Sequence, residues 1–431
     1  MNPSFEEILS TELYKAGARP KAGPDGACCD AKGRVCTVCH ASAAEYVMER
    51  EARSKALAAF WRTQKSRSTL EVLRPSPQGR EYRTVTKRKV FTIGRKAVLG
   101  LIARGPDGRS HPMPVQRCLI EPVAHAAIYR VVQDKLAKPY ATPLAAVLRH
   151  VVVKGGESEQ TVLFTVGETD RDSSHALNTL SKSLTHELPS VVGVYLYLDE
   201  SRGTHFLGTR NPHKQPVFRR IFGKGEVYET VGTRPFLYHP LSFSQVNPAV
   251  SERIAEAIAV RLDPQPTDFL YDFYCGYGLF TLLLAPRVQG AVGVELSPFS
   301  VESAIANARR HGCANARFRR GDITAELVQK TMERSTAADI VILDPPRGGT
   351  APGVIESIAV RQPRRVAHLV CNIELLAAEC KRWERNGYTI ASLTPFDMFP
   401  GTDEVEVLAV FHASPAARVR GDAEFKVDSQ R

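Results

Sequence analysis

Residues 269–278 read FLYDFYCGYG and predict a buried strand that runs into a glycine turn. Glycine lets the backbone approach a ligand closely and open a following helix, so Gly276 and Gly278 suit a ligand-binding turn. A single Gly-x-Gly is a weak signal, because a simple tight turn has the same composition. The fold therefore has to be inferred from what surrounds this stretch.

Strands and helices alternate on both sides of the turn. We expect helices at 248–262, 279–286 and 298–312, and further strands at 290–296, 316–322, 339–346, 364–372 and 406–411. Such alternation predicts an α/β fold with a Rossmann-like, doubly wound sheet. In sheets of this kind, ligands bind at the carboxyl ends of the strands.

Acidic residues stand at several of these strand ends. Glu295 ends the second strand, where a carboxylate can accept hydrogen bonds from ribose hydroxyls. Asp322 follows the third strand, near where an adenine could lie, and Asp344 follows the fourth. A dinucleotide site would show the fuller Gly-x-Gly-x-x-Gly, which is missing here. The pattern favours a class I S-adenosylmethionine methyltransferase over a nucleotide-binding fold of another chemistry.

A thiol and a carboxylate complete the candidate chemistry. Cys371 follows the fifth strand, and Glu406 opens the last one. A thiolate that attacks C6 of uracil makes C5 nucleophilic enough to accept a methyl group, and a base must then remove the C5 proton. We expect Cys371 as nucleophile and Glu406 as base. The alternatives are a structural buried cysteine and an ordinary charged strand end.

Positive charge is concentrated before this domain. The chain has a net charge of +11, and residues 51–110 hold fifteen Lys and Arg against four acids. Such a patch suits a polyanion, because phosphate contacts release counterions. A basic solvated surface is the alternative.

The nine cysteines predict a metal site rather than disulfides. An odd count argues against a disulfide framework, and Cys28, Cys29, Cys36 and Cys39 crowd into twelve residues. By spacing alone, an iron–sulfur cluster and zinc are equally compatible with these thiols.

The rest of the chain predicts three parts. Residues 1–70 hold the cysteines and a helix over 42–61, with a capping box from Ser42 and Glu45. Residues 71–240 read as β-rich, with strands at 98–105, 160–168, 191–200 and 226–232 and one helix at 125–138. Residues 241–431 form the methyltransferase domain. The chain has no run of eighteen apolar residues and no signal peptide, so we expect a cytoplasmic protein without a membrane partner or an evident obligate protein partner.

These motifs together resemble those of the RNA 5-methyluridine (uracil-5-) methyltransferase family over nearly the full length. The motifs that carry the resemblance are SQVNP at 244–248, DFYCGYG at 272–278, VGVELS at 292–297, DPPRGG at 344–349, VCN at 370–372 and MFPGTDEVE at 398–406. By position, Gln245, Tyr274, Glu295 and Asp344 match residues that contact S-adenosylmethionine. Cys371 matches the nucleophile and Glu406 the base. The implied fold is a class I methyltransferase domain with a β-rich central domain before it.

The resemblance also implies an N-terminal [4Fe–4S] segment. Some ribosomal RNA members hold such a cluster through one Cys, a Cys-x-x-Cys pair and a distant Cys. Here Cys28 is the preferred first ligand over Cys29, Cys36 and Cys39 form the pair, and Cys118 is the distant ligand. Zinc stays the alternative. The implied role is a staple between the N-terminal segment and the central domain, and the implied substrate is 23S ribosomal RNA.

Departures from the family pattern bear on the substrate and the pocket. Val370 and Ile373 flank Cys371-Asn372 where the family has Ser and Pro, and Gly401 and Glu404 replace histidines. The family's aromatic-Arg-Asn-Lys motif, which helps to hold RNA, reads Tyr-Arg-Thr-Val at 82–85. Cytosine C5 methylation would place a Cys after Asp-Pro, and adenine N6 methylation favours an aromatic after Pro-Pro, where Arg347 stands. The remaining alternatives are 5-methyluridine formation in tRNA and a non-catalytic RNA-binding iron–sulfur protein.

Overall fold

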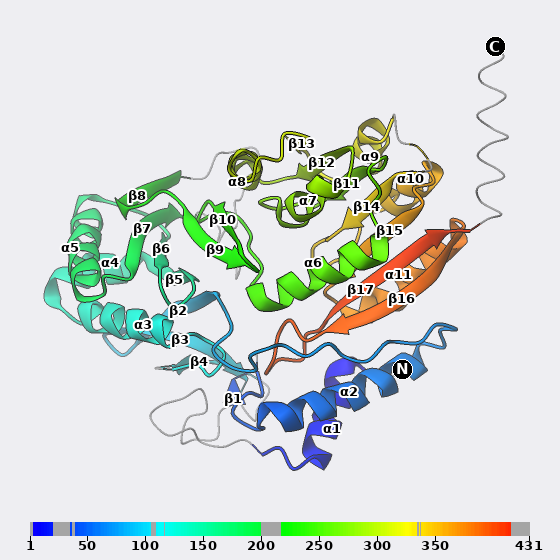
Figure 1. Cartoon of the computed structure of the whole chain (residues 1–431). Helices are drawn as coiled ribbons and strands as arrows, with labels where there is room; N and C mark the ends of the chain where they lie inside the picture. The colour runs from blue at the N-terminus through cyan, green and yellow to red at the C-terminus, as the bar shows by residue number, and fades with distance from the viewer. Residues whose placement is uncertain are drawn as a thin grey trace.

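Two large sheets organise the chain, one in each half (Figure 1). The computed structural model describes residues 3–19, 35–36, 39–104, 109–115, 117–199, 217–333, 336 and 338–414. Within these ranges, none of the helices combines the length and the apolar character that a bilayer crossing demands. Cys28 and Cys29 lie outside the described residues.

The second half forms a seven-stranded sheet in the order β13-β12-β11-β14-β15-β17-β16, in which only β17 runs against the others. Its strands are β11 (Phe269–Phe273), β12 (Gly290–Glu295), β13 (Ala316–Arg320), β14 (Ile340–Leu343), β15 (Arg365–Val370), β16 (Tyr388–Phe396) and β17 (Glu406–Ala413). Its helices are α6 (Pro248–Leu262), α7 (Leu279–Leu284), α8 (Pro298–Arg310), α9 (Ala325–Thr331), α10 (Val354–Val360) and α11 (Ile373–Arg385). The predicted alternation of strands and helices is confirmed.

Helices cover both faces of this sheet because its strands are apolar on both sides. All four residues of β14 are fully buried, as a central parallel strand requires. Val341 and Leu343 pack in the core with α10 and α11, whereas Ile340 and Ile342 pack in the core with α6 and α7. This division follows the alternation of side chains along a strand.

The N-terminal helices join the core of this second half. Helices α1 (Phe5–Lys15) and α2 (Tyr46–Thr63) bury Leu9, Phe60 and other side chains in the core that α10 and α11 share (Figure 1). The predicted capping box is wrong: α2 begins four residues after Ser42, its N-cap is Glu45, and no side chain caps it. The pattern Ser-x-x-Glu therefore precedes the helix here and does not cap it.

The central part is a sheet in the order β1-β3-β2-β5-β6-β7-β8, with β4 paired to β3. Its strands are β1 (Val35–Cys36), β2 (Val85–Ile93), β3 (Lys96–Arg104), β4 (Ser110–Pro114), β5 (Leu148–Gly155), β6 (Gln160–Val166), β7 (Val191–Leu198) and β8 (Val217–Gly223). A separate hairpin of β9 (Val227–Val231) and β10 (Arg234–Tyr238) leads into the second half. The boundaries at residues 70 and 240 stay predictions.

The central part is less β-rich than the sequence suggested. Besides α3 (Val123–Leu136) it contains α4 (Thr142–Val147) and α5 (Arg171–Glu187), so the prediction of a single helix is wrong. Helix α5 is rich in Ser and Thr, which hides it from composition. Its apolar residues Leu177, Leu180 and Leu184 recur at helical spacing and are fully buried against the sheet.

Candidate functional site

Four predicted site residues lie at one edge of the seven-stranded sheet. Tyr274 follows β11, Glu295 ends β12, Asp344 follows β14, and Cys371 follows β15. Because these strands are parallel, their carboxyl ends meet at the same edge. The sheet therefore brings together residues that are 97 positions apart in the chain.

The glycine turn is held by its neighbour strand. Tyr274 has a left-handed φ of 68°, and the backbone amide groups of Tyr274 and Cys275 donate to the carbonyl of Val294 at 2.9 and 3.1 Å. A non-glycine residue at positive φ is uncommon and marks a backbone that its surroundings dictate. The amide of Gly276 donates to Glu295 Oε2 at 3.2 Å, and Ser297 donates to Oε1 at 2.8 Å. The turn and the Glu295 carboxylate are thus oriented together.

Buried carboxyl groups gather below this turn. Burial, then Asp272 and Glu295, raise the pKa of Asp344 to about 7. Burial raises the pKa of Asp272 to about 7, although Thr281 Oγ1 donates to its Oδ2 at 2.5 Å. Asp272 Oδ1 is buried and has no hydrogen-bond partner among the described residues. A cationic ligand would relieve this crowding of negative charge, because an opposite charge favours the ionised carboxylate.

The linker before α6 brings a fifth predicted residue to this edge. Gln245 Nε2 donates to Asp344 Oδ2 at 3.1 Å. The sequence reasoning missed Phe243, two residues earlier, whose side chain is 66% exposed. A large aromatic side chain in a turn, outside any apolar repeat, was the available signal.

Cys371 and Glu406 are neighbours on adjacent strands. Strands β15 and β17 are antiparallel, and their ladder ends at the pair Val370 and Val407. Cys371 follows Val370 and Glu406 precedes Val407, so both residues lie at the same end of this ladder, where the Glu406 carboxylate is close enough to raise the pKa of the Cys371 thiol. Glu406 is 5% exposed, and its Oε1 has no hydrogen-bond partner among the described residues.

The electrostatics favour the protonated form of both groups in the absence of ligands. Burial, then the Glu406 and Asp344 carboxylates, raise the pKa of Cys371 to about 12. Burial, then Asp344, raise the pKa of Glu406 well above its usual value. Arg347 acts in the opposite direction on the pKa of Cys371 and forms an ion pair with Glu404. A cation in the crevice would favour the thiolate that nucleophilic attack requires.

Positive charge lines one face of the central sheet. Lys87 and Lys89 share a face of β2 with His150, which is paired with Lys89 across the ladder. Burial, then Lys87 and Lys89, lower the pKa of His150 to about 4. Arg53 and Arg88 are fully buried, and Arg88 pairs with Glu121, so the basic surface predicted for residues 51–110 includes neither side chain. The charge of Arg88 is used in this buried ion pair, because the even-numbered side chains of β2 point toward the helices that cover the sheet.

Aromatic side chains continue this face toward the methyltransferase half. Tyr195 and Phe218 stack at a centroid distance of 5.2 Å, and His239 stacks on Phe299 of α8 at 4.3 Å. Helices α3 and α5 cover the opposite face of the sheet. The face of the sheet that carries Lys87, Lys89 and these aromatic rings we call the basic face; Tyr195 is fully buried within it, in an apolar cluster with Phe218.

Two of the predicted cluster ligands lie in one apolar cluster. Cys118 is buried, and Cys39 packs against the same group as Tyr82 and Met113. The backbone of Cys36 pairs with Ala103 in β3, but its side chain is not described, and Cys28 lies outside the described residues. Within the part of the chain that the structure describes, no three potential ligands lie together as a metal site, so the cluster stays a prediction.

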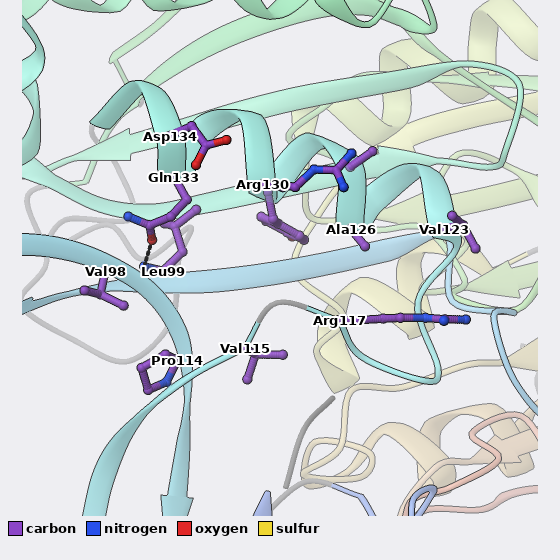
Figure 2. A pocket seen from close by; sticks show the side chains of 12 residues that line it. Val98, Leu99, Pro114, Val115, Arg117, Val123, Ala126, Arg130, Gln133 and Asp134 are labelled. Atoms are coloured by element: carbon purple, nitrogen blue, oxygen red, sulfur yellow. Dashed lines mark hydrogen bonds between the residues drawn. The ribbon is translucent and has the colours of Figure 1, made fainter. Parts of the chain in front are cut away.

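The central part also has a hollow of its own. It lies between α3 and the β3–β4 region, has a volume of about 670 Å³, and contains Arg117 and Arg130 on its rim (Figure 2). Gln133 lines this hollow, and its side chain is fixed to β3, since it accepts from Leu99 N at 2.7 Å and donates to Ala97 O at 2.9 Å. None of the predicted site residues lines this hollow, so it is separate from the crevice of Cys371.

Comparison with known families finds a match in the second half. The sequence model described as tRNA (Uracil-5-)-methyltransferase matches residues 221–413. An RNA methyltransferase of Gloeobacter violaceus is 30% identical over 350 residues, covering 80% of this chain and 72% of that protein. The 23S rRNA (uracil(1939)-C(5))-methyltransferase of Klebsiella pneumoniae is 34% identical over 214 residues, 50% of this chain and 49% of its own.

Other relatives are matched over part of their length. The match to an RNA methyltransferase of Oceanobacillus iheyensis, at 28% identity, spans 61% of this chain and 55% of that protein. Among solved structures, the Pyrococcus abyssi tRNA (uracil-54, C5)-methyltransferase in complex with S-adenosyl-L-homocysteine superposes with a TM-score of 0.64 at 19% identity. That superposition covers 86% of this chain and 85% of the other. The two chains share a fold.

Proposed function

Because the chain belongs to the family of S-adenosylmethionine-dependent RNA (uracil-5-)-methyltransferases, we propose that it methylates C5 of a uridine in RNA through a covalent adduct on Cys371. The observation that carries the proposal is the juxtaposition of Cys371 and Glu406 at the ligand-binding edge of the sheet. A thiol and a carboxyl group at the same end of the ladder can act on the same pyrimidine ring.

The methyl donor fits the acidic edge. Gln245, Tyr274, Glu295 and Asp344 would hold S-adenosylmethionine, which supplies an electrophilic methyl group on a sulfonium. The donor carries positive charge on its sulfonium and its amino group, whereas the buried Asp272 and the half-buried Asp344 are carboxyl groups with raised pKa values. The unpartnered Oδ1 of Asp272 is consistent with a hydrogen-bond donor that comes from a ligand.

The protein groups then act in sequence on the uracil. Cys371 loses its thiol proton to solvent and its thiolate adds to C6. The electron pair that moves to C5 takes the methyl group, and the S–CH3 bond of the donor would break to leave a neutral thioether. C5 now bears both a proton and a methyl group. Glu406 removes that proton, the C5–C6 double bond forms again, the C6–S bond breaks, and the thiolate of Cys371 departs. Glu406 takes this proton in its ionised form, which the positive charge of the bound donor would favour, and its raised pKa makes that carboxylate a stronger base than an exposed one.

The basic face would hold the RNA. Lys87, Lys89 and Arg220 lie on a sheet face that leads toward α8, so phosphates there would direct a strand toward the crevice.

The exposed ring of Phe243, two residues from Gln245, offers a stacking surface for a base that has left its stack. We expect Phe243→Leu to lower kcat/KM for RNA and to leave cofactor affinity unchanged; equal loss of both would contradict this role.

A [4Fe–4S] cluster on Cys28, Cys36, Cys39 and Cys118 is proposed as the N-terminal staple, with zinc as the alternative. Its support is the shared apolar cluster of Cys39 and Cys118 and the four-thiol set that such clusters require. Anaerobically purified protein should contain about four iron and four sulfide per chain, and Cys118→Ser should lose both. Stoichiometric zinc without iron would overturn the cluster.

The covalent step is tested with RNA that contains 5-fluorouridine. With fluorine at C5 there is no proton for the base to remove, so the thiol cannot be eliminated. The covalent adduct therefore persists and can be detected by mass spectrometry. Wild type should form this adduct in the presence of S-adenosylmethionine, and Cys371→Ala should not. If wild type binds the cofactor and RNA but forms no adduct, the non-catalytic RNA-binding protein is the better reading.

The proposed substrate is 23S ribosomal RNA, which the similarity to the Klebsiella enzyme supports over half of the chain. The shared fold with a tRNA methyltransferase keeps tRNA as the second candidate. Mapping 5-methyluridine in both RNAs from a deletion strain decides between them. Loss of the modification from tRNA alone would overturn the ribosomal assignment.

A further inference from the structure

Glu406 directly follows a loop that is hydrogen-bonded to side chains of the N-terminal helix α2. Residues 397–405, here called the base loop, connect β16 to β17 and end immediately before Glu406. Tyr46, Glu49 and Arg53 of α2 contact this loop, and their spacing of three and four residues places them on one side of the helix.

Arg53 is fully buried and directs its guanidinium at the backbone of the base loop. Its Nη1 donates to the carbonyl of Glu404 at 2.7 Å, and its Nη2 donates to the carbonyl of Thr402. Its Nε lies 3.5 Å from Asp397 Oδ1 at the start of the loop. One planar group thus spans both ends of the segment that leads to Glu406.

Glu49 and Tyr46 complete this attachment. Glu49 is fully buried, pairs with Arg53 at 3.2 Å, and accepts from the amide of Gly401 at 2.5 Å. Tyr46 donates its hydroxyl to Asp397 Oδ2 at 2.9 Å. Together the three α2 side chains contact the loop at residues 397, 401, 402 and 404.

Burying the charged groups of Arg53, Glu49 and Asp397 costs free energy. Packed apolar side chains would hold the helix and the loop together as well or better. Hydrogen bonds give a fixed geometry that apolar packing lacks, because each donor has one acceptor. The same loop carries Glu404, which forms an ion pair with Arg347 in the loop that follows β14. The base loop is therefore set between α2 and the loop that follows β14.

We propose that Arg53, with Glu49 and Tyr46, positions the Glu406 carboxylate against C5 of the bound uridine. Arg53 does not touch the substrate and acts through the backbone of the base loop. This inference rests on the proposed function, because it concerns the proton removal that ends the reaction. In that step the C5 proton passes to Glu406, its electron pair forms the C5–C6 double bond, and the C6–S bond to Cys371 breaks.

The inference predicts a defect in one step only. Arg53→Lys keeps the charge, but one ammonium group cannot replace the planar contacts to two carbonyls. We expect kcat to fall about 10- to 100-fold, since small misplacements of a reacting group have effects of this size. KM values for RNA and cofactor should stay within about twofold, because the crevice for both is unchanged. The methylated covalent adduct should accumulate on unmodified RNA, because its release requires Glu406.

Matched variants separate positioning from general stability. Arg261→Lys weakens another ion pair between the N-terminal region and the second half, in which Arg261 Nη2 binds Glu71 at 2.6 and 2.8 Å, away from the base loop. It should leave turnover and adduct level unchanged. Glu49→Gln, which preserves shape, decides by the same criterion if Arg53→Lys fails to bind cofactor. Turnover rates are divided by the concentration of cofactor-binding sites, so that unfolded protein does not lower the measured rate.

The possible failures are distinguishable. If wild type traps no adduct with 5-fluorouridine RNA, the proposed function itself is wrong. If wild type traps the adduct but Arg53→Lys turns over like Arg261→Lys, the positioning role is wrong and the proposed function stands. A variant that only lowers the melting temperature, without adduct on native RNA, also overturns the positioning role.

Discussion

At the scale of single residues, Cys371 lies in surroundings that oppose its ionisation. Burial and two neighbouring carboxyl groups raise the pKa of its thiol to about 12, so the unliganded enzyme holds a thiol at neutral pH. The proposed donor is cationic and would reverse this balance on binding. The nucleophile would then be activated only when the methyl group that it serves is present.

Removing one of those carboxylates should activate the thiol directly. In Asp344→Asn the pKa of Cys371 should fall, because a negative charge near the sulfur is gone. The measurement is the pH dependence of iodoacetamide alkylation at Cys371, followed by mass spectrometry, with a midpoint at lower pH in the variant. Cys380 is the internal control, because the carboxyl groups that raise its pKa are Glu384 and Glu379. A midpoint that stays or rises would contradict this electrostatic account.

The acidic pair also predicts a pH dependence of cofactor binding. The pKa values of Asp272 and Asp344 are raised to about 7, so both groups are largely protonated at pH 5.5 and ionised at pH 8.5. A cation binds the ionised form better, so affinity for S-adenosylmethionine should rise with pH through this window and binding should release protons. Calorimetry in buffers of different ionisation enthalpy measures both.

S-adenosylhomocysteine serves as the control ligand in that experiment, because it lacks the sulfonium charge. Its affinity should depend less steeply on pH. Equal slopes for the two ligands would show that the sulfonium does not interact with Asp272 and Asp344.

At the scale of elements, strand β2 separates two uses of positive charge. Lys87 and Lys89 belong to the basic face, whereas Arg88 points the other way into an ion pair with Glu121. The alternation of side chains along a strand makes this division. A count of basic residues in the sequence cannot distinguish the two groups, and it therefore overstated the surface available to RNA.

The basic face predicts a specific salt dependence. The double variant Lys87→Ala/Lys89→Ala should weaken RNA binding at every sequence and reduce the slope of log affinity against log salt by about 2, one for each phosphate contact. Lys182→Ala, on α5 at the opposite face of the sheet, should leave the slope unchanged. Fluorescence anisotropy over a range of salt concentrations is the measurement. Equal slopes for wild type and the double variant would exclude β2 from the interface.

At the scale of the whole molecule, the buried side chains form separate cores. One core lies between the central sheet and helices α3 to α5, and two cover the faces of the seven-stranded sheet. Helices α1 and α2 belong to a core of the second sheet, although the cysteine segment between them reaches the first sheet through β1 (Figure 1). The N-terminal region thus connects both halves.

Separate cores predict separate unfolding. Leu180→Ala in α5 leaves a cavity in the central core and should cost about 2–5 kcal/mol there. In thermal unfolding followed by calorimetry, the transition that S-adenosylmethionine does not shift should move to lower temperature. The cofactor-dependent transition should stay in place. A single transition that moves as a whole would contradict the proposed division into domains.

The sequence alone determined the α/β alternation of the second half and the ends of the strands that carry the site, whereas the edge strand β16 was not predicted. These features follow from local information, because apolar runs, glycine turns and strand–helix alternation are written in neighbouring residues. Helix α5 was missed although its Leu spacing was visible, because Ser and Thr dominate its composition. The placement of Tyr274, Glu295, Asp344 and Cys371 at one edge was also foreseeable, since parallel strands share a carboxyl edge.

Only the tertiary structure decided the rest. That Glu406 lies near Cys371 depends on the antiparallel register of β17 with β15, which no local pattern encodes. The burial of Arg53 and Arg88, the raised pKa values of the acidic edge and the contacts of α2 with the base loop all arise between residues far apart in the chain. Charge and chemistry at a site depend on what surrounds each group, and those surroundings exist only after the chain has folded.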